Sequence, residues 1–341
     1  MMKLTREPDI VRQLQLRQES AGSNAATMAR LVADTRFGAN IAVTCRGKVD
    51  GAGAQAMATI SAMAMARFAR CRYLHSPFTS VAHAEGMPQD WARRWESFLN
   101  FGDGETLVPE GAELVSLASV IQAPGNYAGR PVIIVERVFG LPAEIGVPIR
   151  DGLRSELRAK YWRSSKSSIP SHRGPAGGFT VAIHLRRGDV TRMKNVNRYA
   201  PDEFVLRQID RVKQTLAPFG RPLTLNLYSE GAVADFRAFA DAGCNLHVSE
   251  DTFETFHNMV TADILVGAYS TFSYVAGLLS EGIMLDHRVR APGFSNWISR
   301  RKNRDISIKR LRHAVLGGMG WLERFRYRAR RCRQKVPLAR Q

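Results

Sequence analysis

The chain has 341 residues, 45% of them hydrophobic and 23% charged, a composition that excludes disordered and fibrous proteins and allows two domains of ordinary size. The formal net charge is +18, but residues 300–341 contribute +13 of it, through fifteen Lys and Arg against two acids. The remaining residues hold 34 basic and 29 acidic side chains, so the body of the protein is close to charge balance and its tail makes it basic.

The first forty residues predict a polar, helical N-terminal extension. Met1–Asp9 has no apolar core behind its positive charge, which excludes the pattern of a secretory signal. The longest weakly polar run, 54–66, is too short to span a bilayer. The four cysteines show neither metal-ligand spacing nor a disulfide framework, as in a reducing compartment. We therefore expect a cytoplasmic protein.

An N-terminal α/β lobe is predicted over residues 41–165. Its expected strands and helices follow in the order strand 41–45, a helix ending at Arg70, strand 72–75, helix 91–99, strand 114–117 and strand 131–135. After the first strand comes Asp50-Gly51-Ala52-Gly53-Ala54-Gln55. Gly51 and Gly53 allow the backbone to approach a ligand closely at the start of a helix, whose N–H groups face that ligand. The same glycines also fit a simple tight turn.

The segment 163–178 has the composition of a loop, and we place the domain boundary there. A C-terminal α/β lobe is predicted over residues 178–295, with alternating elements: strand 179–185, helix 202–217, strand 223–228, helix 232–241, a strand near Leu246, helix 253–261, strand 263–267, helix 271–281 and a strand at 283–285. Such alternation is typical of a parallel sheet covered by helices. The expected fold class is α/β with two lobes facing across a cleft, followed by a basic C-terminal tail at 300–341.

The strand 179–185 leads directly into a cluster of charge, His184-Leu185-Arg186-Arg187-Gly188-Asp189. His184 and Arg186 share one face of the strand because side chains alternate. Ligands of open α/β sheets bind at the carboxyl edge, and two adjacent guanidinium groups there indicate an anionic ligand, a phosphate or diphosphate above all. The competing interpretation is a solvent-exposed turn in which Arg187 and Asp189 form an ion pair of little energetic value.

A second strand end belongs to the same predicted edge. Asp263–Gly267 is a buried strand, and a turn of small residues then leads into a helix that opens on Ser270, Thr271 and Phe272. Hydroxyl side chains are preferred helix N-caps, and the free N–H groups of a first helical turn form a phosphate site. A capped helix with nothing bound is the competing interpretation.

These motifs resemble a known family. The pattern His-x-Arg-Arg-x-Asp, followed by a strand, a turn and a helix with Ser-Thr-Phe-Ser, is similar to that of the fucosyltransferases with the GT-B fold, the nodulation, α1,2-, α1,6- and protein O-fucosyltransferases among them. Asp50–Gln55 resembles the Gly-x-x-Gly-Asn-Gln loop of the α1,2 enzymes, with Ala54 in the place of Asn. The resemblance extends loosely over residues 41–290, by motif order and spacing.

The resemblance implies transfer of fucose from GDP-fucose with inversion at the anomeric carbon, without an essential metal or a cofactor other than the donor. Another GDP-sugar also remains open as the donor. By position, Arg186 would contact the diphosphate, Arg187 would assist or brace the loop, and His184 would line the nucleotide pocket. The other expected donor-binding residues are Ser270, Thr271 and Phe272 around the phosphates, Asp251 on the guanine edge, and the loop residues Gly51, Gly53 and Gln55.

The chemistry is consistent with this assignment, because the chain has no Asp-x-Asp pair to hold a divalent cation and fixed guanidinium groups can stabilise a leaving diphosphate instead. Inversion also needs a base for the acceptor hydroxyl. In the α1,6 enzymes a glutamate shortly after the Arg pair looks suited to act as the base, and the corresponding residue here is Lys194. Asp189 and Asp50 are the candidates for this base, and we predict Asp189 as the catalytic residue. The resemblance implies that the N-terminal lobe 41–165 is the acceptor side and that the C-terminal lobe 178–295 binds the nucleotide sugar. The expected acceptor is a glycan, a lipid-linked glycan or a protein.

Six arginines between Arg324 and Arg333 alternate with Phe325 and Tyr327 in the tail. This basic amphipathic segment predicts peripheral contact with the anionic inner face of a membrane, or association with nucleic acid, which we rank lower. A solvated extension without a partner fits equally well. Two other functions stay open: a catalytically silent GDP-sugar-binding protein, and a nucleic-acid-binding protein acting through its tail. Isolated histidines such as His247 are interpreted as structural.

Overall fold

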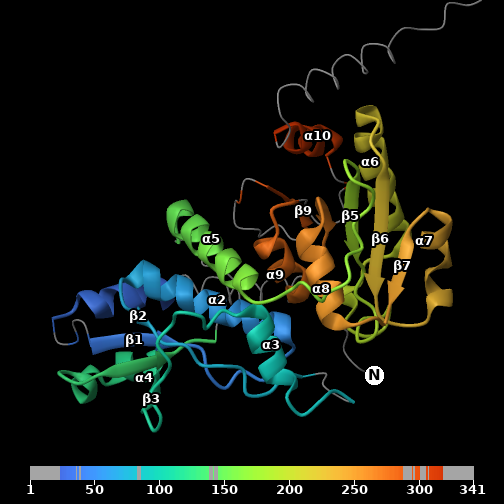
Figure 1. The fold of residues 1–341 in the computed structure, drawn as a ribbon. Helices are drawn as coiled ribbons and strands as arrows, with labels where there is room; N and C mark the ends of the chain where they lie inside the picture. Colours follow the sequence, from blue (N-terminus) through green and yellow to red (C-terminus); the bar gives the residue numbers. More distant parts are fainter. Residues whose placement is uncertain are drawn as a thin grey trace, which may run out of the picture. The chain divides into compact units, whose positions relative to one another are not determined.

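The computed structural model describes residues 24–35, 37, 40–82, 86–137, 141, 145–286, 294, 296–299, 305 and 307–317 (Figure 1). The chain divides into two compact units, Met1–Lys166 and Ser167–Gln341, and the division falls within the loop-like segment 163–178. None of the helices in the described ranges is both long and apolar enough to cross a membrane.

Unit 1 is built on a four-stranded parallel sheet in the order β2-β1-β4-β3. Its strands are β1 Ile41–Thr44, β2 Arg72–Tyr73, β3 Leu114–Ser116 and β4 Val132–Val135. Its helices are a segment at 24–33, α2 Ala52–Ala69, α3 Trp91–Leu99, α4 Leu117–Gln122, the 3-10 turn Pro124–Tyr127 and α5 Val147–Arg163. The Ala- and Met-rich α2 is almost wholly buried, since small side chains allow close packing on the sheet.

Alternation along the strands of unit 1 separates two apolar clusters. Ile41, Val43 and Ile134 pack with residues of the 24–33 helix, α2 and α4, whereas Ala42 and Ile133 contribute to a smaller cluster. Strand β1 is therefore buried on both faces, as the central strands of parallel sheets are.

The helix α5 is absent from the sequence prediction. Seven of its seventeen residues are charged, and its buried residues include Leu153, Leu157 and Tyr161, four positions apart. That spacing places all three on one face of a helix. Lys160 on the same helix is also buried; it donates to the carbonyl oxygen of Phe101 at 3.0 Å and pairs with two glutamates. A narrow apolar stripe and an internal ion pair thus stabilise a helix that composition alone does not reveal.

Unit 2 holds a six-stranded sheet in the order β10-β9-β8-β5-β6-β7, and every neighbouring pair is parallel. The strands are β5 Phe179–His184, β6 Leu223–Ser229, β7 Asn245–Val248, β8 Ile264–Val266, β9 Ile283–Asp286 and β10 Trp297–Ser299. The helices are α6 Asp202–Leu216, α7 Arg237–Asp241, α8 Thr252–Thr261, α9 Thr271–Leu279, α10 Ile308–Gly317 and 3-10 turns at Val196–Arg198, Ala217–Phe219 and Val233–Phe236.

Numbered from β5 onward, the strands of unit 2 follow the order 3-2-1-4-5-6 of the Rossmann fold. The order reverses between β5 and β8, which are hydrogen-bonded neighbours. In open α/β sheets, ligands bind outside the carboxyl ends of the strands at such a switch point. The expected fold class, α/β with two Rossmann-like units, is confirmed. The two strand ends predicted to bind phosphate are those of β5 and β8.

Unit 2 departs from the sequence prediction at three elements. The expected helix 232–241 is a 3-10 turn followed by the short α7. The edge strand β10 has only three residues, too few for a sequence pattern. Residues 308–317, expected in the basic tail, form α10, which lies against α6 and buries Leu311 and Val315 in the unit 2 core (Figure 1). The proposed amphipathic segment Arg324–Arg333 and residues 1–23 lie outside the described residues.

Candidate functional site

The guanidinium of Arg186 joins two elements at the switch point of unit 2. It follows β5, where His184 ends the strand and Leu185 is buried. Its Nε donates to Asp189 Oδ1 at 2.9 Å and its Nη2 to Asp189 Oδ2 at 2.6 Å. The remaining nitrogen, Nη1, lies 3.4 Å from Ser270 Oγ at the start of α9. The side chains of Arg186 and Asp189 are 22% and 26% exposed, so a ligand can reach them.

Ser270 caps α9, as its residue type predicts. Its hydroxyl oxygen accepts a hydrogen bond from the Phe272 N–H at 3.2 Å, and its own backbone is extended, as at an N-cap. The N–H groups of the first turn of a helix have no intrahelical acceptor and carry partial positive charge. The N-terminus of α9 and the Arg186 guanidinium therefore direct N–H donors into one corner, which suits a phosphate group, while Asp189 offsets the formal charge of Arg186.

His184 is half-buried beside this corner, with its ring centroid 5.7 Å from that of Phe272. Burial, with a further contribution from the charge of Arg186, lowers the pKa of His184 to about 3. The imidazole is therefore neutral at physiological pH. Its Nδ1 is buried and has no hydrogen-bond partner among the described residues, which is unusual for a polar atom in a native structure. A neutral ring with one unpaired nitrogen is suited to hydrogen-bond a ligand.

Arg187 is held by contacts within the loop. Its guanidinium pairs with Asp202 at the start of α6, and Nη2 donates to the carbonyl oxygen of Ala200 at 2.8 Å. The group also stacks on the ring of Tyr199, 4.3 Å from the centroid, and Nη1 donates to the Arg186 carbonyl oxygen at 3.1 Å. These contacts fit the bracing role better than direct contact with a ligand; a part for Arg187 in donor binding stays a prediction.

Asp251 has a local structural task. Its Oδ1 accepts hydrogen bonds from the N–H groups of Phe253 and Glu254, both at 2.9 Å, and so caps α8. The side chain belongs to an exposed residue, and no hydrogen bond involves Oδ2 within the described part of the chain. Capping and recognition of a guanine edge are thus compatible in this side chain.

The glycine loop predicted to bind the donor belongs to unit 1. Gly51 is the N-cap residue of α2, with extended backbone, and Gly53 is buried within that helix. Gln55 donates through Nε2 to the carbonyl oxygens of Asp50 at 2.8 Å and Ser80 at 2.6 Å. The amide of Gln55 therefore ties the loop together, and a contact with the donor stays a prediction.

The proposed bases differ in their surroundings. Both oxygens of Asp189 accept from Arg186. Asp50 accepts from the Gly51 N–H at 2.8 Å and lies 3.8 Å from Lys48 Nζ. A third acid, Glu230, is absent from the sequence prediction. It follows β6 at the same carboxyl edge, is exposed, and lies so close to Gly188 that a methyl group there would collide with Oε2.

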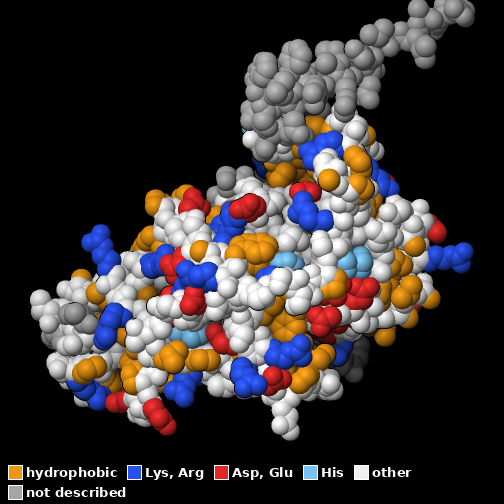
Figure 2. Space-filling view, viewed as in Figure 1, with side chains coloured by type: hydrophobic (Ala, Val, Ile, Leu, Met, Phe, Trp, Pro, Cys, Tyr) orange, Lys and Arg blue, Asp and Glu red, His pale blue; other side chains and the backbone are white. Residues whose placement is uncertain are grey.

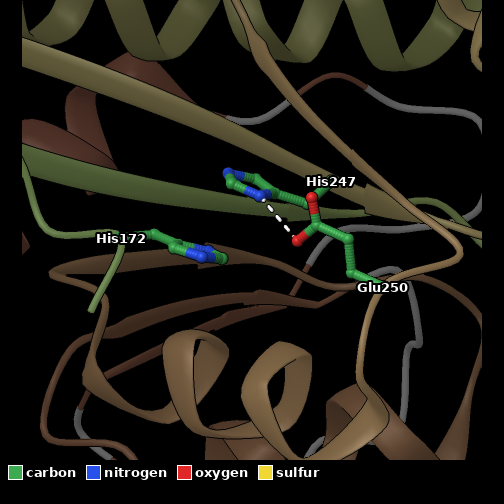
Figure 3. Close-up of side chains that lie close together, drawn as sticks. All are labelled: His172, His247 and Glu250. Atoms are coloured by element: carbon green, nitrogen blue, oxygen red, sulfur yellow. Dashed lines mark hydrogen bonds and ion pairs between the residues drawn. The ribbon is translucent and has the colours of Figure 1, made fainter. Parts of the chain in front are cut away.

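Two histidines from distant parts of the sequence stack near the carboxyl ends of β6 and β7 (Figure 3). The rings of His172 and His247 are parallel within 11°, with centroids 3.8 Å apart, and the His247 ring also stacks on Tyr228 at 5.0 Å. His172 Nε2 lies 2.6 Å from Glu254, and His247 Nδ1 lies 2.9 Å from Glu250. Figure 2 shows acidic side chains beside histidine side chains in this region of unit 2.

This cluster has the composition of a metal site, since His172, His247 and Glu250 offer ligand atoms within 4.8 Å of one another. Imidazoles coordinate through lone pairs in the ring plane, which must converge on the ion. Parallel stacked rings direct those lone pairs along parallel planes instead. The geometry therefore fits two stacked histidine–carboxylate pairs better than a metal centre. Its two histidines are far apart in the chain, so no local sequence pattern indicates this cluster.

No family model and no curated protein matches the sequence. Among solved structures, the chain is similar to the E. coli heptosyltransferase WaaC with ADP-2-deoxy-2-fluoro heptose, with a TM-score of 0.36 and 11% identity, over 82% of this chain and 99% of that one. It is similar to POFUT1 in complex with GDP-fucose, with a TM-score of 0.26 and 10% identity, over 73% of this chain and 72% of that one. It is also similar to the glycotransferase of kitacinnamycin, with a TM-score of 0.32 and 12% identity, over 86% and 94%. Likenesses at these TM-scores assign no reaction to this protein. Any reaction must be inferred from its own side chains.

The structure thus brings together four of the sequence-predicted residues at one corner of unit 2: His184, Arg186, Asp189 and Ser270. Phe272 contacts His184 from the first turn of α9. Thr271 opens the same helix. The arrangement offers a guanidinium held in place by Asp189, helix N–H groups and a neutral imidazole. Together these groups can bind a phosphate or diphosphate and stabilise added negative charge on it.

Proposed function

We propose that this protein is a glycosyltransferase that binds a GDP-sugar, GDP-fucose in the first place, at the switch point of unit 2, and transfers the sugar with inversion. The observation that supports the proposal most directly is the approach of Arg186 Nη1 to Ser270 Oγ, 3.4 Å apart, between the ends of β5 and β8. Two motifs chosen from the sequence for phosphate binding therefore meet at the position where this sheet order binds ligands.

The chemistry of the corner matches the leaving group. Cleavage of the bond between the sugar and the diphosphate adds negative charge to the diphosphate, and fixed cationic groups stabilise that charge. Arg186 has Nη1 directed towards α9 while Asp189 holds its other side. Asp189 therefore fixes the orientation of the guanidinium before the donor binds. By analogy with a single oxyanion-hole donor, Arg186 contributes about 10²–10³ in rate.

We propose Glu230 as the general base in place of Asp189. A base must have a carboxylate oxygen available for the acceptor hydroxyl. Both Asp189 oxygens are engaged by Arg186, whereas Glu230 is exposed beside Gly188 in the same loop region. Asp189 then serves as a positioning residue for Arg186.

The first experiment measures the thermal unfolding of the full-length protein with GDP and with ADP. We expect GDP to raise the melting temperature and ADP to have little effect, since a ligand that binds only the folded state stabilises it. Arg186→Ala should abolish the GDP shift, and Lys194→Ala, in an exposed turn that the proposed donor site does not include, should retain it. Equal shifts with GDP and ADP, or an unchanged shift in Arg186→Ala, would contradict the proposal.

A second experiment separates an enzyme from a silent GDP-sugar-binding protein, which the pairing of Asp189 with Arg186 also fits. The protein is incubated with a panel of GDP-sugars without acceptor, and released GDP is measured. Slow hydrolysis of GDP-fucose identifies an enzyme, and we expect Glu230→Gln to reduce it while GDP still binds. Binding without any turnover of the panel identifies the silent protein.

A further inference from the structure

A second charged pocket lies in unit 1, at the carboxyl ends of β1, β3 and β4. It has a volume of about 560 Å³, and Arg46, Arg137, Glu136, Ser116 and Val115 are among the residues that line it. This volume lies within the range of pockets that bind small molecules, and the carboxyl edge is where open α/β sheets bind them. The described residues that line this pocket all belong to unit 1, and none of them is among the residues expected to bind the donor, whose phosphate-binding corner lies in unit 2.

Two guanidinium groups give the pocket its charge. Arg137 Nε donates to the carbonyl oxygen of Arg46 at 2.7 Å, which fixes one arginine against the strand end that carries the other. Gly47 has φ +70°, and a Cβ there would lie 3.0 Å from Arg137 Nη2, so the glycine allows the guanidinium to lie against the backbone. Within the described ranges, neither arginine has a carboxylate partner.

Glu136, the one acid among the described lining residues, does not neutralise these arginines. Glu136 is only 8% exposed, and its Oε2 accepts a hydrogen bond from Asn24 Nδ2 at 3.2 Å. Burial raises the pKa of Glu136, and the bond from Asn24 opposes that effect only in part. The carboxyl of Glu136 thus hydrogen-bonds a neutral amide, that of Asn24, and does not act as the counter-ion of Arg46 or Arg137. Leu114, Val115 and Val135 of β3 and β4 form the apolar part of the wall.

We propose that this pocket binds a sugar-sized ligand through a carboxylate or phosphate group held by Arg46 and Arg137. Guanidinium groups match both anions in geometry and bind them with charge-assisted hydrogen bonds. The apolar part of the ligand then contacts Val115 and Val135. The inference goes beyond the proposed donor site, since it does not depend on which nucleotide unit 2 binds.

The test is calorimetric titration of the full-length protein with glucose, glucuronate and glucose 6-phosphate, three ligands that differ at one carbon. We expect binding of at least one of the two acidic sugars and none of glucose, with affinity that falls as salt is added. Arg46→Gln and Arg137→Gln should each weaken that binding by about tenfold or more. The preferred anion, carboxylate or phosphate, identifies the group that the natural ligand carries.

Two control variants make the test specific. Arg72→Gln changes an exposed arginine on β2, the opposite edge strand of the same sheet, and should bind as the wild type does. Arg186→Ala should also retain binding, because the donor site is not involved. Circular dichroism checks that each variant is folded. The proposal is overturned if glucose binds equally well, if neither acidic sugar binds, if the Arg46 and Arg137 variants bind normally, or if Arg186→Ala abolishes binding.

Discussion

Arg186 and Arg187 are adjacent in the sequence, yet their guanidinium groups have different surroundings. Arg186 faces the N-terminus of α9, whereas Arg187 turns back to Asp202, the Ala200 carbonyl and the Tyr199 ring. Alternation along the strand predicts that the two side chains point apart. Only the folded loop shows that Arg187 is the one held by contacts within the protein.

We predict that Arg187→Ala lowers the free energy of unfolding by about 1–3 kcal/mol, because it leaves Asp202 and the Ala200 carbonyl without a charged partner. Urea denaturation measures the loss. The matched control is Arg207→Ala: that side chain is 57% exposed and lies 3.8 Å from Asp305, so its loss should cost little. A variant of Arg187 with wild-type stability but no GDP binding would place this residue in the donor site instead.

His184 gives the protein a characteristic pH dependence. In the folded state the pKa of the imidazole is about 3, so the ring stays neutral above that pH. In the unfolded chain the ring takes up a proton near its ordinary pKa of 6.5. Between these values the unfolded state binds more protons, so the contribution of His184 to stability decreases as the pH falls. We predict that His184→Asn loses less stability than the wild type between about pH 7 and pH 4. Thermal unfolding across that range measures it, and parallel curves for the two proteins would refute the prediction.

The sequence located part of this corner and missed the rest. His184, Arg186 and Ser270 were predictable, because each lies at a strand end or helix start with a clear residue pattern. The bidentate pairing of Asp189 with Arg186 and the approach of Glu230 to Gly188 were not. Both depend on the path of a loop, which short-range patterns do not determine.

At the scale of elements, the helix α8 depends on its cap. Asp251 accepts from two N–H groups of the first turn, which places its negative charge at the positive end of the helix. We predict that Asp251→Ala costs about 1 kcal/mol of unfolding free energy, whereas Asp251→Asn, which retains a capping oxygen, costs much less.

The same pair of variants tests the role of Asp251 in guanine recognition. Oδ1 of Asp251 is engaged in the cap, so only Oδ2 is open to the guanine edge. In Asp251→Asn the amide oxygen can keep the cap, and the NH2 group that replaces Oδ2 cannot accept a hydrogen bond. We therefore expect Asp251→Asn to keep wild-type stability and lose GDP affinity, measured by titration of the same samples. If Asp251→Asn binds GDP normally, the carboxylate is only a cap.

Elements with strong apolar patterns were predictable, and those with weak ones were not. The strands β5 and β6 and the helices α6 and α8 lie close to their expected ranges, since each is long or distinctly patterned. The helix α5 presents a narrow apolar face among many charges, and β10 pairs only three residues at a sheet edge. Their existence depends on partners that the local sequence does not specify.

At the scale of the whole molecule, the apolar core of unit 2 includes side chains of α10, a helix from the basic end of the chain. Leu311 of α10 is fully buried among residues of α6 and the sheet, and Asp305 accepts from Gln208 at 3.0 Å and Arg211 at 2.8 Å. We predict that Leu311→Ala lowers the free energy of unfolding by about 2–5 kcal/mol through the cavity it leaves.

The control for that prediction is Leu316→Ala, on the same helix but only partly buried, which should cost clearly less. The folded Leu311→Ala variant should still bind GDP, because α10 contributes no residue to the proposed donor site. Differential scanning calorimetry gives both stabilities. Equal losses for the two variants would mean that α10 does not pack as described.

The sequence by itself determined the class of the fold, the order along the chain of the strongly patterned strands and helices (but not α5, β10 or α10), and the residue types that end β5 and open α9. These features follow from local periodicity, capping preferences and charge, which act over a few residues. Only the tertiary structure decided the lateral order of the strands, and with it the meeting of Arg186 and Ser270, the stacking of His172 on His247 and the charged pocket of unit 1. Lateral order depends on contacts between segments far apart in the chain, so no local pattern contains it.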